Sequence, residues 1–287
     1  MTGRQLIRFG HVVNPFSSPL SRALEVGSFE AAGLELAVTR FRNGSEVASG
    51  IERGELDVGL GGHLQTLTSA LGGSGQVFFA ALGFEESPDH LPVAIVVRAG
   101  ESLSGRERGT AIAMSARTAI SDLQLRIFCA AEGLPYGSFR IVTMPFGQMA
   151  GALRHAEIEA ASVPDPFASE IAAAGIGVIV DRGTLSREMP ARGRVMITGL
   201  VSTRHWLVAH RELAQRLRTA VAEAVTSWAE ASSVGQLEGL PGVQMPTFHT
   251  ELHADDLQLA YDLAARRGIV PRRLSAEEVI MEPDLGT

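Results

Sequence analysis

The stretch that decides the fold is GSEVASGIERGELDVGLGGHLQTLTSAL, residues 44–71. Residues 44–54 begin with Gly-Ser-Glu, continue with apolar residues at helical spacing and end in a glycine, which is the pattern of a short helix. Residues 56–60 predict a short strand, and two glycines then lead directly into a second helix that begins at His63. A helix, a strand and a glycine-rich turn into another helix make up half of an α/β sheet unit.

Both helices of this stretch are expected to begin at the same edge of the predicted sheet. Ser45 stands at the start of the first helix and His63 at the start of the second, each among backbone N–H groups without helical partners. Such groups favour an anionic ligand. A simpler explanation is that Gly61 and Gly62 only make a tight turn between strand and helix, and the stretch alone leaves both explanations open.

The composition indicates a large protein core and no affinity for nucleic acid. With 287 residues, of which 45% are hydrophobic, the chain is long enough for about two domains. The net charge is −7 and no run of lysine or arginine forms a basic patch, so nucleic-acid binding is not expected. The single cysteine, Cys129, lies in an apolar segment and predicts a buried thiol. One cysteine excludes disulfides within the chain and cysteine-based metal clusters, and no cofactor is predicted.

No segment has the character of a targeting signal or a membrane span. The N-terminal MTGRQLIRFGHVVN lacks the apolar run of a signal peptide, and no window approaches the roughly 18 apolar residues of a transmembrane helix. If Met1 is the natural start, we expect a cytoplasmic protein. If a leader has been removed, we expect a periplasmic or extracellular one.

Strands and helices alternate along the whole chain. We expect strands at residues 6–13, 34–41, 56–60, 77–82, 93–98, 110–114, 140–144, 159–163, 177–180 and 195–201. We expect helices at residues 18–28, 63–71, 115–133, 145–154, 167–174, 211–231 and 255–267, in addition to the one that begins at residue 44. Loops are expected at residues 83–88, at 232–246 and at 181–194, the last being interpreted as a solvated surface loop with four arginines. Residues 204–209 are interpreted as a continuation of the strand before them.

This order forms two α/β blocks, at about residues 1–95 and 105–195, after which the chain returns to the first block. Two α/β lobes joined by two crossing strands fit such an order. Ligands in these sheets bind at the carboxyl ends of the strands, and between two lobes both sets of ends can face one cleft. We therefore expect a ligand-binding cleft between the lobes.

Several motifs of the chain are similar to those of one known family. They are AGLEL at 32–36, GIERGELDVG at 50–59, Gly-Gly at 61–62, and the helices at 211–231 and 255–270. With these motifs the chain resembles the type-II periplasmic-binding-protein fold, in the branch that binds sulfonates, nitrate, taurine and the pyrimidine of thiamine. The resemblance covers most of the chain and specifies the fold better than the ligand.

The resemblance implies a two-lobed α/β fold with two crossing strands between the lobes. Residues 1–98 and 200–287 would form lobe 1, and residues 99–199 would form lobe 2. The branch also resembles some cytoplasmic enzymes. In the aromatic sulfinate desulfinase the nucleophilic cysteine would fall close to Asn14, and the pyrimidine synthase of thiamine biosynthesis needs a cysteine-rich motif; Cys129 alone supplies neither.

Candidate binding residues of lobe 1 begin at the end of its first strand. In the resembled fold the loop with His11, Asn14 and Phe16 lines the cleft. The amide of Asn14 could hold a carboxylate or sulfonate, and the ring of Phe16 could stack on an aromatic ligand. The alternative is that Asn14 only makes a turn and Phe16 belongs to the core.

Ser45, Gly62 and His63 are expected at helix starts that face the same cleft. The helix dipole disfavours a cation at this end, so the imidazole of His63 should stay neutral. A neutral imidazole could donate one hydrogen bond to a ligand or act as a base. The alternative is a capping role without a ligand.

Lobe 2 offers a matching set. Ser115, Arg117 and Thr118 open the helix that follows the strand at 110–114. Arg117 could form a bidentate pair with a carboxylate or sulfonate. The alternative, which is more common for arginines, is an exposed position on the surface. Asp165, which stands between two prolines, could orient a ligand amine or act as an acid or base; alternatively, it caps the helix after it.

Two hypotheses from different classes follow. The first is a solute-binding protein that holds a small organic anion, a carboxylate or sulfonate that could be aromatic, in the cleft and, if exported, meets an ABC-transporter permease. The second is a cytoplasmic lyase, decarboxylase or desulfinase-like enzyme on the same scaffold, with His63 or His11 as general base and Arg117 holding the acid group of the substrate. The lack of a leader sequence favours the enzyme hypothesis. The lack of a nucleophile, and of a residue that would orient a general base, favours the solute-binding hypothesis. A regulator's effector domain is disfavoured because no DNA-binding helix pair precedes the first strand.

Overall fold

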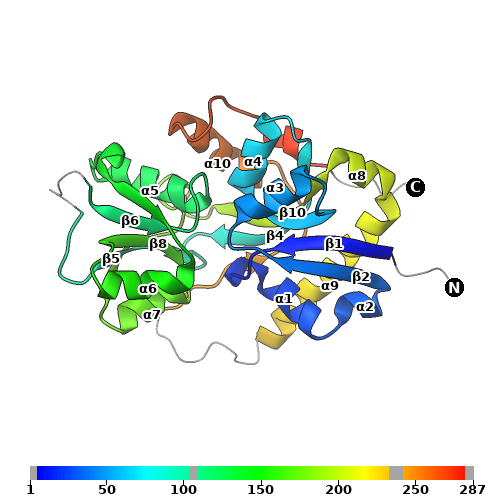
Figure 1. Ribbon diagram of the computed structural model, residues 1–287, viewed down its shortest axis with the longest axis horizontal. Helices are drawn as coiled ribbons and strands as arrows, with labels where there is room; N and C mark the ends of the chain where they lie inside the picture. Colours follow the sequence, from blue (N-terminus) through cyan, green and yellow to red (C-terminus); the bar gives the residue numbers. More distant parts are fainter. Residues whose placement is uncertain (1–4, 104–108, 233–241, 282–287) are drawn as a thin grey trace.

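Two β-sheets with helices packed on their faces make up the protein (Figure 1). The computed structural model describes residues 5–103, 109–232 and 242–281. The first sheet contains, in spatial order, β11 (Thr247–Phe248), β4 (Gln76–Glu86), β10 (Arg194–Thr203), β3 (Val58–Gly62), β1 (Gln5–His11) and β2 (Leu34–Arg40). The second contains β7 (Arg140–Thr143), β6 (Ala111–Met114), β8 (Ala160–Pro164), β5 (Val93–Arg98) and β9 (Gly177–Arg182). The predicted α/β class is confirmed.

The helices alternate with the strands as expected. Those next to the first sheet are α1 (Ser18–Glu25), α2 (Ser28–Ala31), α3 (Gly44–Glu52), α4 (His63–Leu71), α8 (Arg204–Ala209), α9 (Arg211–Ser232) and α10 (Asp255–Arg266). Those next to the second sheet are α5 (Ile120–Ala131), α6 (Phe146–Arg154) and α7 (Phe167–Ala173). Short 3-10 helices are η1 (Pro15–Ser17), η2 (Tyr136–Ser138) and η3 (Ala276–Val279).

Parallel strands bring several helix starts to one edge of each sheet. In the first sheet, β1 lies between β2 and β3 and runs parallel to both. In the second sheet, β6 lies between β7 and β8 and is again parallel to both. The carboxyl ends of parallel strands meet at the same edge, and α3, α4, α5 and α6 begin shortly after β2, β3, β6 and β7, respectively. The N-termini of these four helices therefore lie at the carboxyl edges of the two sheets.

The apolar core is continuous between the two lobes. One cluster of buried side chains packs Val93 and Leu123 from the second lobe together with Val195 and Leu257 from the first. Three further clusters fill the remaining faces of the sheets. Apolar packing therefore holds the lobes together where the chain crosses between them.

Two local predictions are wrong. Residues 83–86, expected in a loop, continue β4, because β10 pairs with this strand as far as Arg194 opposite Glu86. Residues 204–209, expected in a strand, form α8, because the side chain of Thr203 accepts a hydrogen bond from the N–H of Trp206 (3.1 Å) and caps a helix there.

The strand pairing favours lobe boundaries other than those expected at residues 98 and 199. β5, expected in lobe 1, pairs with β8 and β9 of the second sheet. The first half of β10, expected in lobe 2, pairs with β4 and β3 of the first sheet. The chain therefore crosses between the sheets in the segments 87–92 and 183–193, and we propose these as the lobe boundaries.

Ion pairs hold the segment 181–194 against the rest of the protein. This corrects the interpretation of the segment as a solvated surface loop with four arginines. Three of the four make ion pairs with largely buried carboxylates, each at 2.7 Å: Arg182 with Asp165, Arg187 with Asp181, and Arg194 with Asp256. The fourth, Arg192, is exposed. This crossing is consequently anchored to both lobes.

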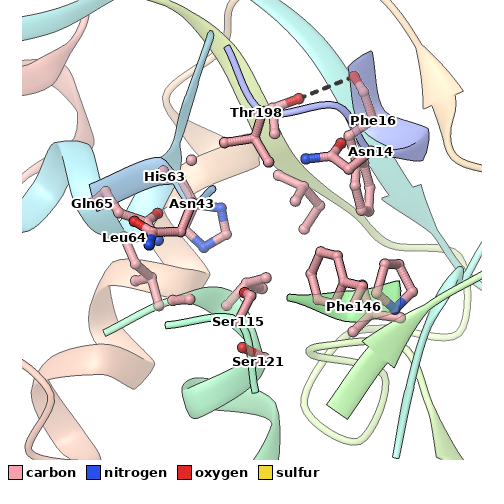
Figure 2. Close-up of a pocket in the computed structure, with 18 of the residues that line it drawn as sticks. Asn14, Phe16, Asn43, His63, Leu64, Gln65, Ser115, Ser121, Phe146 and Thr198 are labelled. Carbon is pink, nitrogen blue, oxygen red and sulfur yellow. Dashed lines mark hydrogen bonds between the residues drawn. The ribbon is translucent and has the colours of Figure 1, made fainter. Parts of the chain in front are cut away.

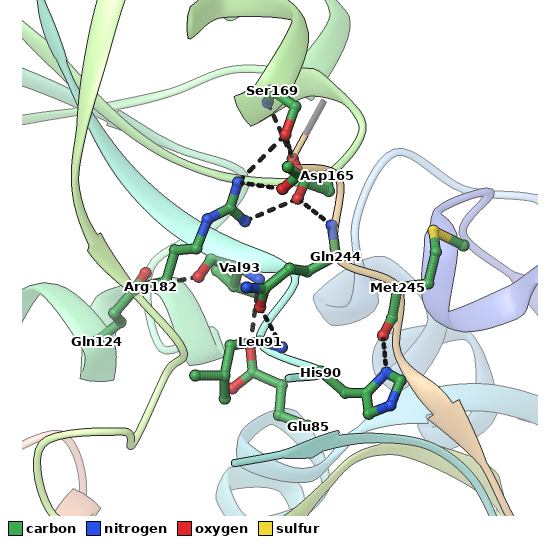
Figure 3. Close-up of polar contacts among 11 residues, drawn as sticks. Glu85, His90, Leu91, Val93, Gln124, Asp165, Ser169, Arg182, Gln244 and Met245 are labelled. Carbon is green, nitrogen blue, oxygen red and sulfur yellow. Dashed lines mark hydrogen bonds and ion pairs between the residues drawn. The ribbon is translucent and has the colours of Figure 1, made fainter. Parts of the chain in front are cut away.

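A further connection lies after α9, and we call its residues 242–248 the strap (Figure 3). The N–H of Gln244 donates to Oδ2 of Asp165 at 2.7 Å, and the side chain of Gln244 accepts from the N–H of Leu91 at 2.8 Å. At its other end, β11 pairs with β4. The strap is therefore bound to the second lobe at one end and to the first sheet at the other. Most of the loop predicted at 232–246 lies outside the described residues.

A buried carboxylate joins the end of β4 to the second lobe. Glu85 is 0% exposed and accepts a hydrogen bond from the N–H of Val93 (3.2 Å; Figure 3). It also accepts from the N–H of Thr184 (2.7 Å) and from the Thr184 hydroxyl. Burial raises the pKa of Glu85 from its usual 4.5 to about 7, because the loss of solvent outweighs these hydrogen bonds. The negative charge of Asp181 acts in the same direction.

Replacing this carboxyl should change how stability depends on pH. A raised pKa means that the contribution of Glu85 to stability is fully present below about pH 4.5 and is lost as the pH rises through about 7. We therefore expect the free energy of unfolding of Glu85→Gln, relative to wild type, to rise by roughly 2–3 kcal/mol between pH 4.5 and pH 8. Urea unfolding at several pH values measures this difference. Parallel curves for the two proteins would contradict it.

Candidate functional site

A cleft between the two sheets has a volume of about 790 Å³, part of which is open to solvent (Figure 2). Its wall combines apolar side chains, among them Phe16 and Phe146, with neutral polar ones. The polar side chains are amides and hydroxyls, namely Asn14, Asn43, Gln65, Ser115, Ser121, Ser162 and Thr198, together with the imidazole of His63. An apolar wall with a few neutral polar groups is typical of a site for a small molecule.

Four helices start in the wall of this cleft. Gly44, His63, Ile120 and Phe146 are the first residues of α3, α4, α5 and α6, and all four line it. The starts of α4, α5 and α6 have no side-chain cap, whereas the side chain of Asn43 caps α3. Uncapped N–H groups and the positive ends of the helix dipoles make this wall attractive to a negative charge.

Formal charge is almost absent from the cleft wall. Among the described residues that line it, none is acidic, and Arg42 is the only one with a full charge. Arg42 is bound to Glu46 through its Nε at 2.9 Å, and its side chain is 80% exposed. The electrostatic character of the wall therefore comes mainly from helix ends and neutral hydrogen-bonding groups.

The two glycines before α4 have a packing role as well as a place in the cleft. A Cβ on Gly61 would lie 2.6 Å from a methyl group of Val201, and one on Gly62 would collide with the side chain of Gln65. Gly62 lines the cleft, whereas Gly61 does not. The turn explanation and the binding explanation are therefore compatible.

His63 is a neutral imidazole buried in the cleft wall. It is 1% exposed, and desolvation lowers its pKa to about 4 although the nearby carbonyls of Met196 and Ile197 favour the protonated form. Neither ring nitrogen makes a hydrogen bond of ordinary geometry with the described residues. The ring of Tyr261 lies behind it, with centroids 6.3 Å apart. The prediction of a neutral histidine at a helix start agrees with this geometry.

With this geometry in place, the chain can be compared with known proteins. The model of the NMT1-like family matches residues 4–235, which is most of the chain. The chain belongs to the NMT1-like family. No curated protein sequence shows significant similarity to this NMT1-like chain.

Solved structures share the fold of this NMT1-like protein. The alkanesulfonate-binding protein of Xanthomonas axonopodis pv. citri, bound to MOPS, has a TM-score of 0.75 at 17% identity, covering 96% of this chain and 98% of that one. The periplasmic aliphatic sulphonate-binding protein of Escherichia coli has a TM-score of 0.69 at 17% identity, covering 97% and 92%. The periplasmic nitrate-binding protein of Synechocystis has a TM-score of 0.72 at 13% identity, covering 98% and 92%. The predicted periplasmic-binding-protein fold is confirmed.

Five of the residues predicted to bind a ligand line the cleft of the NMT1-like protein: Asn14, Phe16, Gly62, His63 and Ser115. Ser45 and Arg117 line an adjoining hollow, which we call the mouth because it shares Arg42, Asn43 and Ser115 with the cleft. Arg117 is exposed there. That these residues contact a ligand stays a prediction.

The other three predicted residues lie elsewhere. His11 is 1% exposed in the core beside Phe9, because it points to the same side of β1 as that residue; desolvation and then Arg40 lower its pKa to about 4. Thr118 has a left-handed backbone (φ +60°), and its N–H donates to Asp122 at 3.3 Å.

Asp165 has the structural role that we gave as its alternative. It is 0% exposed and caps α7 by accepting from the N–H of Ser169 at 2.9 Å, while it pairs with Arg182. It does not line the cleft or the mouth.

Several cleft residues were missed by sequence reasoning. Asn43 could have been found as the capping residue just before Gly44, and Phe146 as the first helical residue after a strand and a proline. Ser162 and Thr198 lie within strands and carry no local signal. In the described parts of the chain, histidine, cysteine and acidic side chains form no group of three that could hold a metal ion. Within those parts, every helix is too short or too polar to cross a membrane.

Proposed function

We propose that this NMT1-like protein is a solute-binding protein that holds a small organic anion, a carboxylate or sulfonate, in the cleft between its lobes. The observation that carries the proposal is the convergence of four helix N-termini, three of them uncapped, on a wall whose described residues include no acidic side chain. Each such terminus favours a negative charge by about 0.3–1 kcal/mol. Four together suit one anionic group better than a neutral or cationic ligand.

The apolar part of the wall supports an organic rather than an inorganic anion. Phe16 and Phe146 line the cleft together with aliphatic residues such as Leu64 and Ile197. These side chains would be left facing water around nitrate, whereas a carbon skeleton would cover them. The sulfonate-binding proteins among the fold neighbours agree with this chemistry.

A solute-binding role further implies a permease partner and a place outside the cytoplasmic membrane. The enzyme hypothesis needs His63 or His11 as a base. His63 has no carboxylate to orient it among the residues that the structure describes, and His11 does not line the cleft. The geometry therefore favours binding over turnover.

The proposal is tested by ligand-observed NMR of the purified protein with small carboxylates and sulfonates, followed for hours. We expect line broadening for one class of anion and an unchanged compound afterwards. New product signals, absent in boiled protein, would overturn the proposal in favour of an enzyme.

Arg117 at the mouth should strengthen the binding of an anion that the NMR panel identifies. Because the guanidinium is exposed, we expect Arg117→Ala to weaken the affinity only about three- to tenfold, and less at high salt. Titration calorimetry at low and high ionic strength measures this effect. Arg192→Ala, which removes another exposed arginine away from the cleft, is the matched control. Equal affinities for both variants would remove Arg117 from the site.

A further inference from the structure

Three polar side chains in the cleft wall hold buried atoms without hydrogen-bond partners among the residues that the structure describes. They are the ring nitrogens of His63, Oδ1 of Asn14 and Oγ of Ser121. Figure 2 shows the His63 ring and the Asn14 amide in the wall of the first lobe and Ser121 on the opposite side. Buried polar atoms in proteins are nearly always hydrogen-bonded, so unpartnered ones in a cleft indicate the polar pattern of its ligand.

His63 specifies what kind of partner is needed. A neutral imidazole has one N–H donor and one nitrogen with a lone pair. The carbonyls of Met196 and Ile197 lie close enough to favour the protonated ring, although not at the geometry of a full hydrogen bond, so the N–H is best placed toward them. The other nitrogen then presents a lone pair, and because the pKa of His63 is about 4 it keeps that lone pair at neutral pH.

An oxyanion that carries no hydroxyl group cannot donate a hydrogen bond to this nitrogen of His63. Nitrate, and the head groups of an unsubstituted sulfonate or carboxylate, carry only acceptor atoms at neutral pH. The N–H groups at the start of α4, in contrast, need an acceptor at the same end of the cleft. A hydroxyl group meets both needs, since it donates one hydrogen bond and accepts others.

We propose that the ligand of the cleft is an organic anion that also carries a hydroxyl group, and that His63 selects for this hydroxyl by accepting its hydrogen bond. This inference rests on the proposed function. The charged end of the ligand then lies toward the uncapped starts of α5 and α6, and the hydroxyl end lies at His63. His63 is thus a specificity residue rather than a base.

The test uses matched pairs of compounds that differ by one hydroxyl group. They are 4-hydroxybenzoate and benzoate, 4-hydroxybenzenesulfonate and benzenesulfonate, and 2-hydroxyethanesulfonate and ethanesulfonate. We expect wild type to bind the hydroxylated member of at least one pair about tenfold or more tightly, and His63→Phe to reduce that preference to less than about twofold. His11→Phe is the control, because His11 is equally buried and unpartnered but does not line the cleft.

A second measurement does not depend on the variant folding. The ¹⁵N signal of the lone-pair nitrogen of His63 in wild type should move upfield when the hydroxylated compound binds, and should not move with its partner compound. Equal affinities within every pair that binds, or a preference that survives in His63→Phe, would overturn the inference while the proposed function stands. Binding of no compound in any pair would overturn both.

Discussion

Asp165→Ala should lower the free energy of unfolding by about 3–5 kcal/mol, which is the usual cost of removing one partner of a buried ion pair. Asp165 is fully buried, and its two carboxylate oxygens accept four hydrogen bonds: from the N–H and hydroxyl of Ser169, from Arg182 and from the N–H of Gln244. Without the carboxylate, the largely buried guanidinium of Arg182 loses its counter-charge, α7 loses its cap and the strap loses an anchor. Urea unfolding monitored by circular dichroism measures the change.

A matched control separates this effect from a general loss of negative charge. Asp89→Ala removes an exposed aspartate in the crossing segment 87–92 and should change stability by less than about 0.5 kcal/mol. A loss below about 1 kcal/mol for Asp165→Ala would mean that the network around Arg182 does not hold the lobes as described.

Ser121→Asp should weaken the binding of an organic anion by about 100-fold relative to Ser121→Asn. Ser121 is buried, lines the cleft and lies in the first turn of α5. If the anionic group lies at the start of α5, as proposed, a separation of roughly 5 Å at an effective dielectric constant near 20 gives a repulsion of roughly 3 kcal/mol. Titration calorimetry with an anion from the NMR panel measures the two affinities.

Asparagine is the appropriate control because it has nearly the same shape as aspartate without the charge. It separates electrostatic repulsion from crowding of the cleft. If both variants bind the anion equally well, the negative charge of the ligand lies away from α5, and the orientation proposed here is wrong.

The architecture could be predicted from sequence because its signals are local. Alternating strands and helices, the glycine-rich turn at 61–62 and the motifs of the resembled family all lie in short continuous stretches. For the same reason, residues just after strand ends, such as Asn14, His63 and Ser115, could be singled out from the sequence, and they line the cleft; that they bind a ligand stays a prediction.

The remaining differences arise from contacts between residues far apart in the sequence. Thr198 and Ser162 reach the cleft only because of how β10 and β8 are placed in their sheets, which no local pattern encodes. Asp165 was a site candidate because its structural role was not visible in the sequence. Its ion-pair partner, Arg182, lies 17 residues further along the chain, and no local pattern links the two. We expected His11 to line the cleft, but it points into the core. Side chains of a strand alternate between its two faces, so an error of one residue assigns a side chain to the wrong face.

The strap limits how the two lobes can move. The two chain crossings, 87–92 and 183–193, lie at neighbouring points. The line through them defines an axis about which one lobe can rotate relative to the other. The strap is a third attachment, bound beside the first crossing through Leu91 and to the second lobe through Asp165, so rotation in one direction must stretch residues 242–248 or release Gln244 from Asp165. The chain itself therefore bounds the opening angle of the cleft, and the network of Asp165, which does not line the cleft, contributes to that bound.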